Sequence, residues 1–167
     1  AFCAVTTDPY VLFPGSGLAL ETNAIVAEDA VLLLSDGFAV HDPRAGDRTF
    51  AQFASRLTVA RPGGRLLLKD VGRIAGDELH GGALGPMAAA ANVLLIAPPE
   101  RHPSLQELQH AVDRCGAMAG ASIAPNGAGI VLRMLAADGG ALARAMDAAF
   151  HVLAGAALGV ELARRRK

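Results

Sequence analysis

Histidine and carboxylate side chains stand together at two places in the sequence. His41 is followed directly by Asp42, and His80 follows the pair Asp77 and Glu78 after one intervening residue. Imidazole together with carboxylate oxygens suits a divalent transition metal such as nickel or zinc. The chain has five histidines, yet it contains no His-x-x-x-His or His-Glu-x-x-His spacing of the kind found on a zinc-binding helix. Both places are candidates for a transient metal contact, although exposed turns use the same residues for solubility.

Two glycine-rich segments could bind a phosphate or stabilise an oxyanion. Gly15-Ser16-Gly17 follows a proline and opens no predicted helix, and the sequence contains no Gly-x-x-x-x-Gly-Lys-Ser/Thr loop. Gly81-Gly82 stands beside His80, but no Gly-x-Ser-x-Gly nucleophile elbow occurs. The sequence therefore predicts a protein that is not an enzyme and that binds no cofactor tightly. The alternative is an uncharacterised β-sandwich enzyme or small-ligand-binding protein that uses the His80 region.

The composition predicts a single globular domain that spans residues 1–167. Hydrophobic residues make up 52% of the chain and charged residues 19%, which is typical of a folded protein. The formal net charge of -1 gives no basic field that would attract nucleic acid. Cys3 and Cys115 form no ligand-like spacing, so both are expected to be reduced thiols of a cytoplasmic protein.

The most apolar stretches do not predict a membrane segment. Residues 83–97 are too few to cross a bilayer, and residues 141–163 include Arg144, Asp147 and Glu161. The amino-terminal residues have neither a basic leader nor a long apolar run, so no signal peptide is expected. Neither a membrane nor a nucleic acid is therefore expected as a partner.

Short apolar or alternating runs predict strands along the chain, most of them in its front half. The predicted strands are residues 10–13, 18–26, 30–34, 55–59, 65–70, 92–97, 121–124 and 129–135. Gly63-Gly64 supplies the positive φ angles that a tight hairpin turn needs. Residues 36–47, which begin with Asp36-Gly37, are predicted to be turn-rich, and residues 72–85 to be a loop or broken strand. The front half should form an antiparallel layer.

Two helices are predicted in the second half. Ser104 and Glu107 have the spacing of a capping box, which predicts a helix over residues 105–115. An apolar stripe at steps of three and four predicts a second helix over residues 141–162; its members are Leu142, Met146, Ala149, Leu153, Ala157 and Val160. Arg133 should project from its strand to the side opposite Leu132 and Met134. Together these elements predict an α+β fold that is mainly β, with layered antiparallel sheets, one short helix and a long C-terminal helix.

Several of these segments occur in the order in which a known family has them. Asp8-Pro9-Tyr10-Val11-Leu12-Phe13 corresponds to the family's Asp-Pro before a short strand. Ser55-Arg56-Leu57 and Gly64-Arg65-Leu66-Leu67-Leu68-Lys69-Asp70 correspond to its Ser-Arg-Leu and Gly-x-Leu-Leu-x-x-Asp strands. Gly127–Ala136 corresponds to its Gly-x-Val-Val-Arg strand, which precedes the final helix. The chain thus resembles the later part of the urease accessory protein UreD, also called UreH.

The resemblance implies a β-sandwich or β-helical scaffold that lacks the family's N-terminal strands. It also implies a maturation factor that binds UreF, UreG and apo-urease and that helps to deliver nickel to the urease active site. The family's Gly-Arg-x-x-x-Gly-Glu turn is reduced here to Arg44-Ala45-Gly46-Asp47. Around this turn the resemblance suggests His41, Asp42 and Asp47 as transient nickel contacts and Arg44 as a partner contact.

Overall fold

Two β-sheets and a helical layer make up the computed structural model, which describes residues 1–46, 48–81 and 86–163. The strands are β1 (Phe2–Thr6), β2 (Tyr10–Leu12), β3 (Gly17–Ile25), β4 (Val31–Val40), β5 (Gln52–Ala60), β6 (Leu66–Ala75), β7 (Ala89–Ile96), β8 (Ala117–Ile123) and β9 (Gly129–Ala136). The α-helices are α1 (Gly76–Gly81), α2 (Leu105–Asp113) and α3 (Gly139–Leu158), with 3-10 turns at Pro99–Arg101 and Pro125–Gly127. The predicted α+β class, mainly β, is confirmed.

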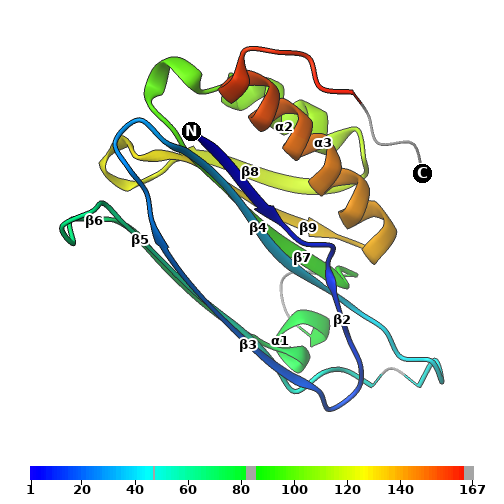
Figure 1. Ribbon diagram of the computed structural model, residues 1–167. Coiled ribbons are helices and arrows are strands. Elements are labelled where there is room, and N and C mark those ends of the chain that lie inside the picture. Colours follow the sequence, from blue (N-terminus) through cyan, green and yellow to red (C-terminus); the bar gives the residue numbers. More distant parts are fainter. Residues whose placement is uncertain (47, 82–85, 164–167) are drawn as a thin grey trace.

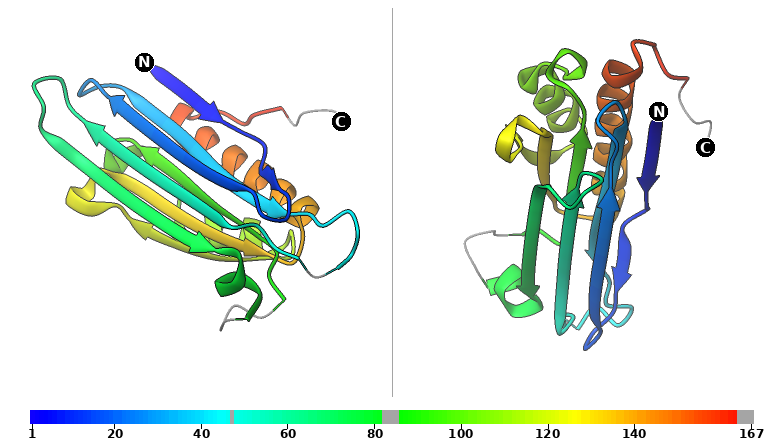
Figure 2. Two further views of the ribbon diagram at one scale, coloured as in Figure 1. Left: turned by 90° about the horizontal axis from the view of Figure 1, so that it is seen from below. Right: turned by 60° about the vertical axis from the view of Figure 1, so that its left-hand side comes forward.

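The two sheets form separate layers (Figure 1). The larger sheet has the order β1-β4-β7-β9-β8, with β2 also paired to β4, and the smaller sheet has the order β3-β5-β6. Helices α2 and α3 cover one face of the larger sheet, and the smaller sheet faces the other (Figure 1). Figure 2 shows the three long strands of the smaller sheet side by side, with α1 at the end of β6.

Both sheets are mixed, whereas the sequence had predicted antiparallel layers. Strands β1 and β2 run parallel to β4, and β3 runs parallel to β5. Parallel neighbours need a crossover connection. Here the crossovers are strands of the opposite layer, because β3 separates β2 from β4 in the chain and β4 separates β3 from β5. Polarity patterns do not report the direction of pairing, so the sequence could not reveal this arrangement.

Parts of two segments predicted to be irregular are regular in the structure, whereas residues 41–46 form the predicted turns. Strand β4 continues through Asp36 and Gly37 to Val40, and β6 continues to Ala75, where α1 begins. Gly37 permits the close approach of β7, since a Cβ atom at this position would lie 2.7 Å from the Cβ atom of Ala91. A glycine that reads as part of a turn is therefore needed here for contact between two strands.

The predicted hairpin and helices are present with shifted ends. Strands β5 and β6 pair antiparallel, and the turn between them holds Gly63 and Gly64 at φ angles of 91° and 89°. The hydroxyl oxygen of Ser104 accepts a hydrogen bond from the backbone N–H of Glu107, as the capping box predicts. Helix α3 ends at Leu158 and is capped by Gly159 in the left-handed conformation, so Val160 lies beyond the helix.

Helix α3 is long and apolar enough, by length and composition, to cross a membrane. A core helix of a water-soluble fold passes the same test, and α3 packs its apolar side on the larger sheet. Its buried residues are Ala141, Leu142, Ala145, Met146, Ala149, Leu153, Ala154 and Ala157. Packing against the sheet thus accounts for the apolar composition.

The described part of the chain contains three apolar clusters in its interior. The first lies between the helices and the larger sheet and includes Leu132 and Leu153. The other two contain side chains of both sheets: one is centred on Leu34, Leu94 and Val59, and the other consists of Phe38 and its neighbours. The contact between the two sheets is therefore divided into two apolar regions.

The close contact between β7 and β9 gives a test of the packing. A Cβ atom at Gly129 would overlap the backbone of Leu95 in β7, whereas one at Gly120 in β8 would meet no atom within 4 Å. We expect Gly129→Ala to lower the free energy of unfolding by about 1–3 kcal/mol because the strands must move apart. Gly120→Ala should change it by less than about 0.5 kcal/mol. Chemical denaturation of both variants tests the packing, and equal effects would contradict it.

Candidate functional site

A row of polar residues crosses the larger sheet. Asp36 of β4 stands opposite Asn92 of β7, Asn92 stands opposite Arg133 of β9, and Arg133 stands opposite Gly120 of β8. Alternation along each strand places the three polar side chains on the face toward the smaller sheet. The smaller sheet presents Ser55 of β5 to this row.

These residues are hydrogen-bonded to one another and to the smaller sheet. Asp36 accepts a hydrogen bond from the Ser55 hydroxyl at 2.6 Å and another from the Asn92 amide at 3.0 Å, one on each carboxylate oxygen. Arg133 donates from Nη2 to Oδ1 of Asp70 at 2.8 Å. The bonds to Ser55 and Asp70 join the two sheets. We call Asp36, Ser55, Asp70, Asn92 and Arg133 the polar seam.

The polar seam separates the two apolar clusters between the sheets. In β4, Asp36 lies between Leu34 of one cluster and Phe38 of the other. The bonds that join Asp36 to Ser55 and Asn92 are partly buried. A polar group withdrawn from water costs free energy unless it is hydrogen-bonded, so the members of this row must lie together. The seam is therefore a structural requirement of placing Asp36 inside β4.

Two cavities adjoin at the polar seam. One, of about 260 Å³, extends toward β1 and β3 and includes Asp70 in its wall. The other, of about 520 Å³, extends toward β6 and β8 and includes Arg133. Asp36, Ser55 and Asn92 line both cavities. The polar seam therefore lies where the two cavities meet.

The predicted metal-binding turn is organised around Asp42. Its carboxylate accepts hydrogen bonds from the backbone N–H groups of Arg44 and Gly46, both at 3.0 Å, and of Arg48 at 3.3 Å. The Arg48 guanidinium adds an ion pair at 2.8 Å. The bond from Arg48, and then those from the backbone, hold the pKa of Asp42 well below its usual range. Asp42 thus acts as an acceptor that closes its own loop.

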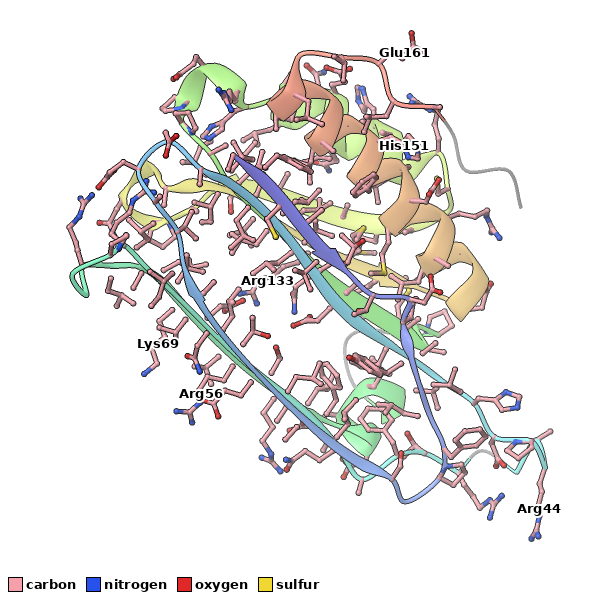
Figure 3. The ribbon with its side chains drawn as sticks, in the orientation of Figure 1. Arg44, Arg56, Lys69, Arg133, His151 and Glu161 are labelled. Atoms are coloured by element: carbon pink, nitrogen blue, oxygen red, sulfur yellow. The ribbon has the colours of Figure 1, made fainter. Side chains whose placement is uncertain are left out.

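The other residues of this prediction lie apart from the polar seam. His41 is exposed, and its ring meets that of Phe13 edge to face at a centroid distance of 5.7 Å. Arg44 points into solvent at the tip of the loop (Figure 3). Asp47 falls outside the residues that the structure describes, as does the side chain of His80. The nickel contacts at His41, Asp42 and Asp47 and the partner contact at Arg44 remain predictions.

Within residues 1–46, 48–81 and 86–163, no group of three or more His, Cys, Asp or Glu side chains is placed to hold a metal ion. Two other histidines bond backbone carbonyls: His102 Nε2 lies 2.9 Å from the oxygen of Ala97, and His151 Nδ1 lies 2.7 Å from that of Asp147. A tight site of the structural zinc type is therefore not assembled from this part of the chain.

Sequence reasoning missed the polar seam, although a signal was present. Asp36, Asn92 and Arg133 each interrupt an apolar strand sequence. Only the direction of Arg133 was predicted, and it is confirmed, since Leu132 and Met134 are buried while Arg133 is exposed. Asp70, the last residue of the predicted strand 65–70, lies within β6 and binds Arg133.

Comparison with known proteins decides the family. The model of the UreD urease accessory protein family matches residues 1–167. The chain belongs to this family. It is 69% identical to urease accessory protein UreD 3 of Bradyrhizobium sp. (strain ORS 278), 67% identical to UreD 1 of Bradyrhizobium sp. (strain BTAi1) and 38% identical to UreD 1 of Methylorubrum populi. The alignments cover 100% of the chain but only 58–59% of each relative. The resemblance to the UreD family read from the strand motifs is thus confirmed.

The Asp42 loop predicts a specific dependence on pH. A carboxylate whose pKa is lowered by folding stabilises the fold above its usual pKa, here 3.8, and this contribution is lost as the pH falls further. We expect Asp42→Asn to lower the melting temperature by a constant amount from neutral pH down to about that value. Below it, the difference from the unmodified chain should shrink.

Calorimetry or circular dichroism at several pH values measures this difference. Asp29→Asn, which removes the carboxylate of an exposed turn residue, is the matched control. A difference for Asp42→Asn that stays constant well below pH 3.8 would show that the carboxylate charge does not stabilise this loop.

Proposed function

We propose that the chain is part of a urease-maturation scaffold that binds UreF, UreG and apo-urease and passes nickel toward the urease active site. The observation that carries this proposal is the family match over residues 1–167, together with relatives named as urease accessory proteins. The chain spans about 59% of the length of the first two relatives, so the activity and partners of a whole UreD protein are proposed here from the region that the chain covers. In this proposal the chain acts in the cytoplasm and catalyses no reaction.

The chemistry of the polar seam supports a role in passing nickel. Asp36 and Asp70 offer carboxylate oxygens, Ser55 a hydroxyl oxygen and Asn92 an amide oxygen. Such oxygen ligands suit hard cations, whereas imidazole and thiolate ligands suit nickel and its neighbours better. An oxygen-lined passage therefore holds nickel weakly. Weak binding is what a carrier needs, because nickel is the cargo and must leave again.

The geometry of the polar seam supports the same role. Asp36, Ser55 and Asn92 lie where two cavities between the sheets meet. A hydrated cation that entered one cavity would meet Asp36, Ser55 and Asn92 before it reached the other. We propose that nickel crosses the sandwich by exchanging water ligands for these oxygens and then regaining water.

The exposed turn after β4 has a separate place in the proposal. His41 and the exposed Arg44 lie at the surface, where a partner can reach them. We propose that His41, with Asp42 and Asp47, makes a first transient nickel contact, and that Arg44 contacts a partner protein. The alternative, an enzyme or ligand-binding protein that uses His80, draws no support from the family match.

Loss of the seam carboxylates should impair nickel delivery. We expect Asp36→Asn and Asp70→Asn, co-expressed with urease subunits, UreF and UreG, to lower the nickel content and activity of purified urease by about tenfold or more, as loss of groups around metal sites commonly does. Co-purification with UreF should persist, because both substitutions preserve size. Nickel content measured by mass spectrometry and a urease assay provide the readouts.

Asp113→Asn is the control, since Asp113 is exposed at the end of α2. It should leave urease activation unchanged. Normal nickel content with both seam variants would contradict a passage through the seam. Failure of the folded, unmodified chain to co-purify with UreF and with urease would contradict the scaffold itself.

A further inference from the structure

Arg133 carries the positive charge of the polar seam. The charged residues that line the two adjoining cavities are Glu21, Asp36, Asp70, Arg73 and Arg133. The Arg73 guanidinium is bound through Nε to the side-chain oxygen of Gln52 at 2.7 Å, outside the seam. Arg133 extends between the sheets, whereas Arg56 and Lys69 point away on the outer face of the smaller sheet (Figure 3).

The guanidinium of Arg133 is bound to a carboxylate oxygen of Asp70 that a passing cation would also use as a ligand. It lies 2.8 Å from Oδ1 of Asp70. A metal ion bound to the same oxygen would stand against a like charge at contact distance, which is unfavourable. With Arg133 in place, the seam has two carboxylates and one guanidinium, a net charge of -1; without it, the net charge would be -2. Arg133 and a divalent cation therefore compete for Asp70.

Arg133 is also placed to leave Asp70 at little cost. Its side chain is 61% exposed, whereas that of Asp70 is 29% exposed. An exposed ion pair is weak because water solvates the separated charges well. The guanidinium can therefore move into solvent without burying an unpaired charge, while the carboxylate stays in the cavity wall.

We propose that Arg133 is an internal competitor for the transported cation, and that it limits the affinity of the polar seam so that the cation is released. The inference rests on the proposed passage through the seam. When a divalent cation arrives, it displaces the guanidinium from Asp70; when the cation leaves, Arg133 binds Asp70 again.

Nickel titration of the purified chain tests this competition. We expect Arg133→Met to bind Ni²⁺ about tenfold more tightly or better, because the removal of a neighbouring positive charge commonly shifts ionic equilibria by that factor. Arg133→Gln should do the same, which guards against a folding defect of one variant. Arg133→Lys should retain the affinity of the unmodified chain in large part. Isothermal titration calorimetry measures the dissociation constants.

The decisive comparison is made in the absence of Asp70. If Arg133 acts through this carboxylate, Arg133→Met should bring no gain in an Asp70→Asn background, which a double-mutant cycle measures. A general structural change would raise or lower affinity in both backgrounds. Arg56→Met is the matched control. Arg56 lies on β5, the strand next to the one that carries Asp70, and it points to the outer face of the smaller sheet, so its loss should not affect nickel affinity.

The outcomes separate this inference from the passage on which it rests. If Arg133→Met binds Ni²⁺ with unchanged affinity while Asp36→Asn binds it more weakly, Arg133 does not compete with the cation. The proposed passage through the seam would then still hold. Normal nickel content of urease matured with the Asp36 and Asp70 variants would overturn the passage. Tighter binding by Arg133→Met that persists without Asp70 would overturn the role assigned to the ion pair.

Discussion

The hydrogen-bond requirement of Asp36 governs the space between the two sheets. A carboxylate in the middle of a strand that packs against another layer has to find donors, because water reaches it only in part. Asn92 on the neighbouring strand and Ser55 on the opposite sheet provide them. These partners fix the register of β4 against β7 and the placement of β5 over β4. The same requirement divides the apolar contact between the sheets into two clusters.

The polar seam also explains why the sandwich is not filled at its centre. Leucine and phenylalanine side chains pack together on either side of the polar seam, but short residues stand beside the seam itself. Gly72 stands opposite Ser55, and Gly120 stands opposite Arg133. Apolar interiors are normally packed to the density of organic crystals, so a row of small and polar residues leaves hollows that side chains do not occupy. The cavities are thus a consequence of the same row that provides their polar walls.

Local features of the fold could be predicted from the sequence, and non-local ones could not. The Gly63-Gly64 hairpin, the Ser104 cap and most of the α3 stripe follow from neighbouring residues. Asp36-Gly37 has the composition of a turn, yet it lies within a strand because residues distant in sequence satisfy the carboxylate and fit the glycine. The polar seam depends on the register of three strand pairs, β4 with β7, β7 with β9 and β5 with β6, which no single segment encodes.

The acceptor capacity of the carboxylates distinguishes the polar seam from the exposed turn. An ionised carboxylate offers about four lone-pair sites. The bonds described for Asp42 come from three backbone N–H groups and a guanidinium, which use this capacity. From the described residues, Asp36 receives two donors, and Asp70 receives one from an arginine that can move into solvent. Among the described residues, the seam carboxylates therefore keep more unused acceptor capacity than the carboxylate of Asp42.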